Sequence, residues 1–203
     1  MKIICVGLNY KTHAIEMGRD FPAEPLVFLK PDSAILLKNK PFFIPDFSED
    51  IQYEAELVFR ICRLGKSIQP RFASRYYDAV TVGIDITARD IQNRQSKAGL
   101  PWDLSKTFDG SAPVGTFIPL EEAMESGEIA FSLDINGSRV QTGSSADMIF
   151  SIDSIISYVS KYYTLKTGDM IFTGTPSGVG PIRKNDNLVA RIGSKKVLDF
   201  KAK

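Results

Sequence analysis

Two glutamates in the run "IQYEAELVFRI", from Ile51 to Ile61, are the first candidates for chemistry in this sequence. Side chains alternate across a strand, so Glu54 and Glu56 point to the same side of a strand formed by this run. One interpretation is an edge or surface strand whose polar face contacts water. The other is that both carboxylates converge on a cation, because like charges this close repel one another unless a positive charge lies between them. The run alone leaves both interpretations open.

A third carboxylate, Asp85, lies in "TVGIDITARD", near the end of an apolar run and just before a predicted helix. Strand ends lie at the edge of a sheet, where polar side chains can form a binding site. With Glu54 and Glu56 it offers three oxygen ligands, which is typical of a catalytic Mg²⁺ or Mn²⁺ site with room for water and substrate. Zinc is disfavoured because the chain has one histidine and no paired cysteines. Three carboxylates among 24 acidic residues also occur by chance, so the metal site is a hypothesis here.

The single histidine, His13, has Glu16 three residues after it in "GLNYKTHAIEMG". On a helical turn the two side chains can meet, and the carboxylate can orient an imidazole that takes a proton from water. A surface helix pair has the same spacing. Lys106, in "LPWDLSKTFDG", has aromatic residues on both sides. It can stabilise an enolate or oxyanion beside a pocket, or extend along the surface into solvent.

The glycine-rich segment "GTPSGVG", residues 174–180, follows a predicted strand. Its spacing is neither that of a phosphate-binding loop nor that of a dinucleotide-binding loop, which argues against phosphate cradling. A tight turn here can present backbone amides and Thr175 to an anionic ligand.

Composition narrows the class of protein. The 203 residues are 24% charged and 43% hydrophobic, with a net charge of +1 and no basic block, which argues against a dedicated nucleic-acid binder. The apolar runs are too short to span a membrane, and the first residues lack the pattern of a signal peptide. Cys5 and Cys62 do not form a disulfide framework. We therefore expect a cytoplasmic protein without nucleic-acid or membrane partners.

Short strands with a few helices must position these residues. We expect one α+β, strand-rich domain over residues 1–203. Its main predicted elements are strands at 2–6, 51–61 and 80–86, a helix over 88–98 ended by Gly99, a hairpin around Asn136-Gly137, a helix from about Ser145 to Tyr163, a strand leading into the glycine-rich segment, and a closing hairpin over 187–200.

Taken together, the motifs resemble the fumarylacetoacetate hydrolase superfamily along nearly the whole chain. The most specific segments are "YEAEL", "DITARDIQ", "PWDLSKTFD" and "TGTPSGVGP". The resemblance implies a mixed β-sandwich roll, a homodimer and bound Mg²⁺ or Mn²⁺. It further implies roles for ten residues: Glu54, Glu56 and Asp85 as metal ligands, His13 and Glu16 as a water-activating dyad, Lys106 in the site, and Lys30, Arg89, Gln92 and Thr175 as substrate contacts.

Within the superfamily the chain is most similar to the compact acylpyruvase and oxaloacetate decarboxylase branch, because it lacks the extra N-terminal domain of true fumarylacetoacetases. The expected activity is metal-dependent hydrolysis of a carbon–carbon bond in acylpyruvate-type 2,4-dioxo acids, with possible decarboxylation of oxaloacetate. The alternatives are an isomerase, tautomerase or decarboxylase of a 2-hydroxy-dienedioate and, from another class, a non-catalytic dicarboxylate binder. One residue departs from the pattern: Leu8 stands where relatives have arginine in "GRNY". This difference bears on substrate choice more than on the chemistry.

Overall fold

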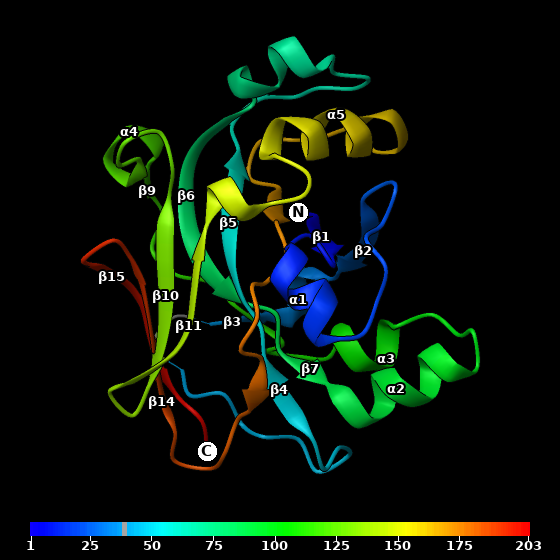
Figure 1. Ribbon diagram of the computed structural model, residues 1–203, viewed down its shortest axis with the longest axis vertical. Coiled ribbons are helices and arrows are strands. Elements are labelled where there is room, and N and C mark those ends of the chain that lie inside the picture. The colour runs from blue at the N-terminus through cyan, green and yellow to red at the C-terminus, as the bar shows by residue number, and fades with distance from the viewer. Residues whose placement is uncertain (38–39) are drawn as a thin grey trace.

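Strands dominate the computed structural model, which describes residues 1–37 and 40–203 (Figure 1). The larger sheet has the order β2 (Leu26–Lys30), β1 (Ile3–Gly7), β12 (Met170–Phe172), β5 (Ala55–Ile61), β6 (Tyr77–Ile84) and β9 (Ile118–Pro119). A second sheet has the order β11 (Ser138–Ser144), β10 (Ala130–Ile135), β14 (Asn187–Ile192) and β15 (Lys195–Lys201). β1 pairs with β12 in parallel and with β2 antiparallel, so the sheet is mixed. The expected α+β, strand-rich architecture is confirmed.

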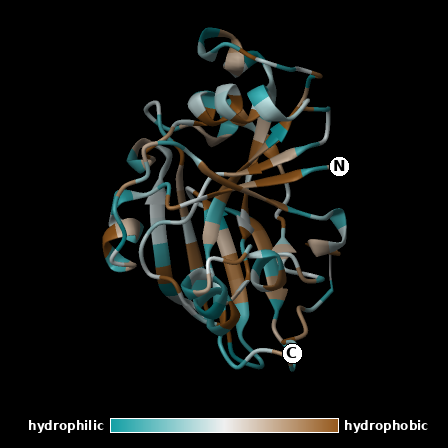
Figure 2. Cartoon of the chain, turned by 90° about the vertical axis from the view of Figure 1, so that its right-hand side faces the viewer, coloured by the Kyte–Doolittle hydropathy of each residue, from teal (hydrophilic) through white to brown (hydrophobic). Residues whose placement is uncertain are grey.

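The main hydrophobic core lies where these two sheets pack together. Leu57 and Val82 of the first sheet belong to the same buried cluster as Leu133 and Ala190 of the second, and none of the four is exposed. Figure 2 shows hydrophobic residues concentrated along the central strands, while many of the peripheral loops are hydrophilic. Burial of these apolar faces drives the two sheets together.

The run from Ile51 to Ile61 forms two strands instead of the one that we predicted. β4 (Ile51–Tyr53) lies in a small sheet between β13 (Gly180–Pro181) and β7 (Thr87–Ala88), whereas β5 belongs to the large sheet. Glu54 lies at the break, and the next N–H, that of Ala55, donates to the Gln141 side chain at 2.9 Å. A side chain from a distant strand therefore replaces a ladder hydrogen bond at this point.

Helix α5 (Ile152–Tyr162) covers the other face of the large sheet, above β1 and β5 in Figure 1. We predicted that this helix begins near Ser145, and that start is wrong. Residues Ser145–Asp147 form a short 3₁₀ turn, and the chain is extended at Met148. The helix begins after Ser151, which is its N-cap because its hydroxyl accepts the N–H of Ser154.

Helix α2 (Arg89–Lys97) matches the predicted span, and Gly99 beyond it has the positive φ of 66° expected at a helix end. Its buried residues are polar: Arg89, Gln92 and Gln95. A helix that buries polar side chains marks a site, because a core-facing helix normally buries its apolar stripe. The other short elements are α1 (Lys11–Glu16), α3 (Asp103–Lys106), α4 (Leu120–Ala123), and the paired strands β3 (Ile35–Leu36) and β8 (Ala112–Pro113).

The other sequence-based expectations about the chain can also be compared with the structure. The predicted hairpin joins β10 to β11, with φ of 53° at Asn136 and 83° at Gly137, as a tight primed turn requires. Cys5 and Cys62 are free thiols. Within the described ranges, no helix combines the length and the apolar character needed to cross a membrane.

Candidate active site

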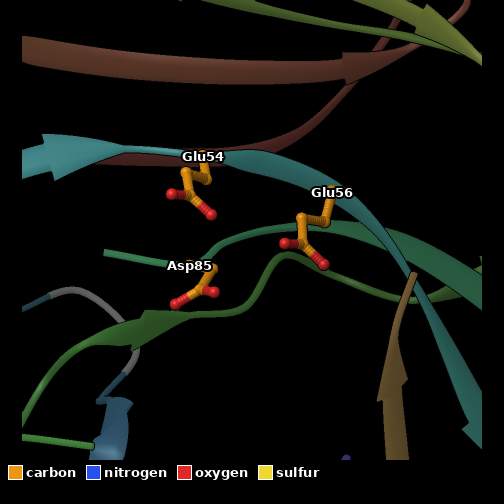
Figure 3. A group of neighbouring side chains, drawn as sticks. All are labelled: Glu54, Glu56 and Asp85. Atoms are coloured by element: carbon orange, nitrogen blue, oxygen red, sulfur yellow. The ribbon is translucent and has the colours of Figure 1, made fainter. Parts of the chain in front are cut away.

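Three buried carboxylates converge where β4 gives way to β5 and where β6 ends (Figure 3). Glu54, Glu56 and Asp85 each offer an oxygen, and these oxygens all lie within 4.8 Å of one another. The three residues are 5%, 2% and 1% exposed. The backbone N–H of Asp85 donates to the carbonyl of Glu54 at 2.8 Å, which ties the end of β6 to the break between β4 and β5. Both glutamates of the predicted strand are therefore buried, and the interpretation that they contact water is wrong.

Cations from three other segments compensate two of the carboxylates. Lys106, from α3, lies 2.9 Å from Glu54 and 2.7 Å from Asp85. The Arg89 guanidinium pairs with the other oxygen of Glu54. Lys30, at the end of β2, lies 2.8 Å from Asp85. Buried charges need partners of this kind, because removal from water is costly for each ion.

Glu56 forms no ion pair with any residue in 1–37 or 40–203. One of its oxygens accepts the backbone N–H of Gly174 at 2.7 Å. A buried carboxylate without a cation is unfavourable, and a divalent ion among the three carboxylates would supply the missing charge. An all-oxygen donor set fits Mg²⁺ or Mn²⁺. The residues present therefore fit a hard divalent metal, with Glu54, Glu56 and Asp85 as its ligands.

The same surroundings shift the pKa values of Glu54, Glu56 and Lys106. Burial raises the pKa of Glu56 well above its ordinary value of 4.5, and the charges of Asp85 and Glu54 add to this effect. Burial alone would raise the pKa of Glu54, but Lys106 and Arg89 outweigh it and hold that pKa low. Burial alone would lower the pKa of Lys106, but Asp85 and Glu54 raise it above its ordinary value. Lys106 therefore remains a cation at neutral pH and does not serve as a base.

The His13–Glu16 pair forms as expected from its spacing. His13 Nδ1 lies 3.1 Å from Glu16 Oε2 within the short helix α1, and His13 is only 5% exposed. The other oxygen of Glu16 accepts the backbone N–H of Gly178 at 3.0 Å. The glycine-rich segment therefore holds the carboxylate that orients the imidazole.

One cavity of about 130 Å³ is lined both by His13 and by the three carboxylates, whereas Glu16 lies outside its lining. It is lined by most of the predicted site residues, namely His13, Glu54, Glu56, Asp85, Arg89, Gln92, Lys106 and Thr175. Lys30 does not line it: its side chain is fully buried and its ammonium donates to Ser111 Oγ at 3.0 Å and to the backbone carbonyl of Lys106. We expected Lys30 to contact substrate. In the structure its ammonium instead bonds to Asp85 from outside the cavity, because Lys30 is the buried last residue of β2.

Arg89 and Gln92 face the cavity from α2 and bond to one another. The Arg89 Nε atom also donates to Gln52 Oε1 at 2.8 Å. Since the guanidinium already bonds to Glu54, Arg89 orients one of the three converging carboxylates as well as bordering the cavity. Thr175 accepts a hydrogen bond from Gln141 at 2.9 Å, which leaves its hydroxyl proton free to face a ligand.

Sequence patterns missed several buried polar groups that hold the site. Thr87 accepts a hydrogen bond from Lys106 Nζ at 2.7 Å and is not exposed at all. Gln141, 2% exposed, bonds to Ala55, Thr175 and the carbonyl of Pro176. The only signal for Gln141 in the sequence is its polar side chain within the alternating pattern of the predicted hairpin strand. Its partners lie more than 30 residues away in the sequence, so no local pattern reveals them.

Leu8 and Asn9 connect β1 to α1 beside the cavity. The Asn9 side chain donates to the carbonyls of Phe150 and Thr173 and accepts the N–H of Phe150 at 2.7 Å. Leu8 lines the cavity with a φ of 55°, in the left-handed region that non-glycine residues rarely adopt. Gly174 packs against this turn: a Cβ on it would lie 2.8 Å from Asn9 Cβ, and its φ is 92°. Glycine is therefore required there.

Comparison with known proteins assigns the chain to a protein family. Residues 2–200 match the family described as fumarylacetoacetate (FAA) hydrolase, C-terminal. The chain belongs to the fumarylacetoacetate hydrolase family. Among its relatives, the mouse protein named oxaloacetate tautomerase FAHD1, mitochondrial, is 41% identical over 201 residues, covering 99% of this chain and 91% of the mouse protein. The Escherichia coli oxaloacetate tautomerase YcgM is 39% identical over 188 residues, covering 92% of this chain and 86% of YcgM.

Solved structures in the fumarylacetoacetate hydrolase family share the fold. The fumarylpyruvate hydrolase of Pseudomonas aeruginosa, solved in complex with Mn²⁺ and pyruvate, matches with a TM-score of 0.92 at 33% identity. The match covers 100% of this chain and 89% of that chain. The expected family fold is therefore confirmed, and relatives of this chain are named for both tautomerase and hydrolase activities.

Proposed function

We propose that this protein is a divalent-metal-dependent enzyme that interconverts the keto and enol forms of oxaloacetate or a closely similar 2-oxo acid. The observation that carries the proposal is that Glu54, Glu56 and Asp85 gather beside His13 in one cavity. The tautomerase names of full-length relatives at about 40% identity support the choice of substrate. This choice moves tautomerisation ahead of the hydrolysis that we expected from the sequence.

The ion would be held by Glu54, Glu56 and Asp85. When bound, Mg²⁺ or Mn²⁺ supplies Lewis acidity, which makes a proton beside a carbonyl easier to remove. His13, oriented by Glu16, accepts a proton from C3 of the 2-oxo acid, and the imidazolium so formed returns that proton to the C2 oxygen to complete the enol. Lys106, which stays charged, lies beside the same carboxylates and offsets negative charge that develops on that oxygen.

Polar residues that line the cavity would orient the substrate. Gln92 and Thr175 have polar groups at the cavity and can bond to a carboxylate of the substrate. Arg89 adds a positive charge there even though it also bonds to Glu54. A dicarboxylate would therefore meet the positive charges of Arg89 and Lys106 beside the three carboxylates.

Hydrolysis of acylpyruvates is the second candidate function, and the His13–Glu16 contact favours it. The same imidazole that takes a proton from carbon can take one from water, which would then attack the distal acyl carbonyl. The fumarylpyruvate hydrolase neighbour supports this alternative. Oxaloacetate decarboxylation and dienedioate isomerisation would use the same enol chemistry without an attacking water, whereas a dicarboxylate binder would not need the dyad.

A turnover screen with Mg²⁺ tests the proposal. Enol oxaloacetate has an ultraviolet absorbance that the keto form lacks, so its loss measures tautomerisation directly; acetylpyruvate, fumarylpyruvate and a 2-hydroxy-dienedioate test the alternatives. We expect the largest rate enhancement with oxaloacetate and loss of it after chelation. Rapid acetylpyruvate cleavage with an unchanged tautomerisation rate would reverse the order of the two candidates, and tight oxalate binding without any turnover would favour the binder.

The homodimer expected from the resemblance stays a prediction. Light scattering coupled to size-exclusion chromatography measures the mass in solution directly. A mass near twice that of the chain, 22.5 kDa, is the expected result.

A further inference from the structure

Arg19 is a cation of the active-site cavity that has no carboxylate partner among the described residues. The other lysine and arginine of the cavity lining are already paired: Arg89 bonds to Glu54, and Lys106 lies 2.7 Å from Asp85. Arg19 is exposed, and its side chain makes neither an ion pair nor a hydrogen bond with the part of the chain that the structure covers. Its guanidinium is therefore available to a ligand.

A Schellman motif at the end of α1 brings Arg19 to the cavity. The N–H of Gly18 donates to the carbonyl of Ile15 at 3.0 Å, and the N–H of Arg19 donates to the carbonyl of Ala14 at 2.9 Å. Gly18 has a φ of 60°, the left-handed conformation that this motif needs and that glycine adopts readily. Ala14 follows His13 directly in the sequence. The backbone of Arg19 is therefore tied to the part of α1 that carries the imidazole.

The proposed chemistry brings the second carboxylate of the substrate to the same segment. In oxaloacetate the C4 carboxylate is bonded to C3, the carbon from which His13 would take a proton. The C2 oxygen and the C1 carboxylate form the other end, which would face the three carboxylates of the protein. The N-terminal segment that carries His13 also contributes Leu8, Met17 and Arg19 to the cavity lining. Since Leu8 and Met17 are apolar, Arg19 is the residue of this segment that can supply a positive charge to C4.

We propose that Arg19 binds the C4 carboxylate of the substrate and makes the site selective for 2-oxo dicarboxylates over 2-oxo acids with an uncharged end. This inference rests on the proposed function, because the place of C4 follows from proton removal by His13. A guanidinium can donate two parallel hydrogen bonds to one carboxylate, so the contact gives direction as well as charge. Arg19 does not touch the reacting atoms in this arrangement, and its contribution is to affinity.

The test compares two ligands that differ only in the charge at C4. Displacement of oxalate, followed by calorimetry in Mg²⁺, measures the affinities of oxaloacetate and of its C4 amide, 2-oxosuccinamate, independently of turnover. We expect the wild type to bind oxaloacetate roughly tenfold more tightly than the amide. Arg19→Gln should remove this difference by weakening oxaloacetate alone, while oxalate and the amide bind as before. Arg19→Lys, which keeps the charge, should retain part of the difference.

Lys11→Gln is the matched control. Lys11 is exposed on α1 and lies outside the cavity lining, so this variant makes the same change in net charge on the same helix. It should leave all three affinities unchanged. In the tautomerisation assay, Arg19→Gln should raise KM for oxaloacetate roughly tenfold and leave kcat within about twofold of the wild type, because the proton-transfer groups are intact.

The outcomes separate this inference from the proposed function. If the wild type neither binds oxalate nor accelerates tautomerisation, the proposed function fails and takes the inference with it. If the wild type is active but Arg19→Gln binds oxaloacetate normally, only the role of Arg19 is wrong. Equal losses for oxaloacetate and the amide, or equal losses in Arg19→Gln and Lys11→Gln, would also overturn the role of Arg19, since neither result reports a contact with C4.

Discussion

The Nδ1 atom of His13 lies 3.1 Å from one carboxylate oxygen of Glu16, and the other oxygen of Glu16 accepts the N–H of Gly178. Because both oxygens are engaged, the imidazole is held from the glycine-rich segment as well as from its own helical turn. None of the three carboxylates proposed as metal ligands takes part in this contact. Proton transfer and metal binding can therefore be altered separately.

His13→Ala should lower tautomerisation and any acylpyruvate hydrolysis by roughly 10²–10⁴-fold, the factor expected for loss of a general base. Oxalate and Mg²⁺ affinity, measured by calorimetry, should stay near those of the wild type because the metal ligands are intact. Wild-type rates in this variant would show that another group moves the proton.

Glu16→Gln should be as damaging as His13→Ala, although it changes one atom. The Gly178 N–H requires the amide oxygen on its side, which turns the amide NH₂ group toward His13 Nδ1. Nδ1 must then accept a hydrogen bond, so the proton moves to Nε2 and the imidazole can no longer take a proton there. Glu16→Ala leaves the tautomer free and should lose less activity. The rates of the two variants decide the matter, since a less active alanine variant would contradict this account.

Glu56→Gln should stabilise the metal-free protein by roughly 1–3 kcal/mol, because it removes a buried carboxylate that has no paired cation among the described residues. The same variant should lose Mg²⁺ affinity and activity. Thermal unfolding with chelator and with Mg²⁺ measures both effects: the ion should raise the melting temperature of the wild type and not of the variant. Equal stabilisation of both by Mg²⁺ would remove Glu56 from the ligand set.

Leu8→Arg should favour dicarboxylates, because Leu8 lines the cavity and the new cation can pair with a second carboxylate. We expect KM for oxaloacetate to fall by roughly tenfold, while KM for acetylpyruvate, which has an uncharged distal end, changes little. Leu8→Met is the control for size. A parallel change for both substrates would mean that the new side chain acts on the common 2-oxo acid end.

The start of α2 should show a pH-dependent stability. Burial alone would raise the pKa of Asp90, but hydrogen bonds from Ser48 and from the backbone N–H of Ile91 and Glu49 hold it below its ordinary value of 3.8. A lowered folded-state pKa contributes stability above the ordinary value, and this contribution is lost as the pH falls through the folded value. Ser48→Ala should therefore cost about 1 kcal/mol at pH 7 and less near pH 3. Urea unfolding at both pH values tests this, and an equal cost at both would contradict the assignment.

The sequence by itself determined much of the chemistry. Alternation along 51–61 placed Glu54 and Glu56 on one side, and the spacing of His13 and Glu16 allowed their contact, because both depend on local backbone geometry. The hairpin at Asn136-Gly137 and the end of α2 at Gly99 also follow from local conformational preferences. The start of α5 was misplaced because Met148, before Ser151, fits the helical spacing of the apolar residues. The Ser151 hydroxyl caps the helix and fixes its true start.

Only the tertiary structure decided what those residues face. Burial of Glu54 and Glu56 depends on Lys106, Arg89 and Asp85, which reach them from other segments. The break at Glu54 depends on Gln141, 86 residues from Ala55, which takes the hydrogen bond that a continuous strand would have used. Lys30 illustrates the same limit, since its place behind Asp85 follows from the position of β2 beside β1. Contacts between residues far apart in the sequence leave no periodic signal, and they determine which carboxylates are paired and that Glu56 has no cation among the described residues.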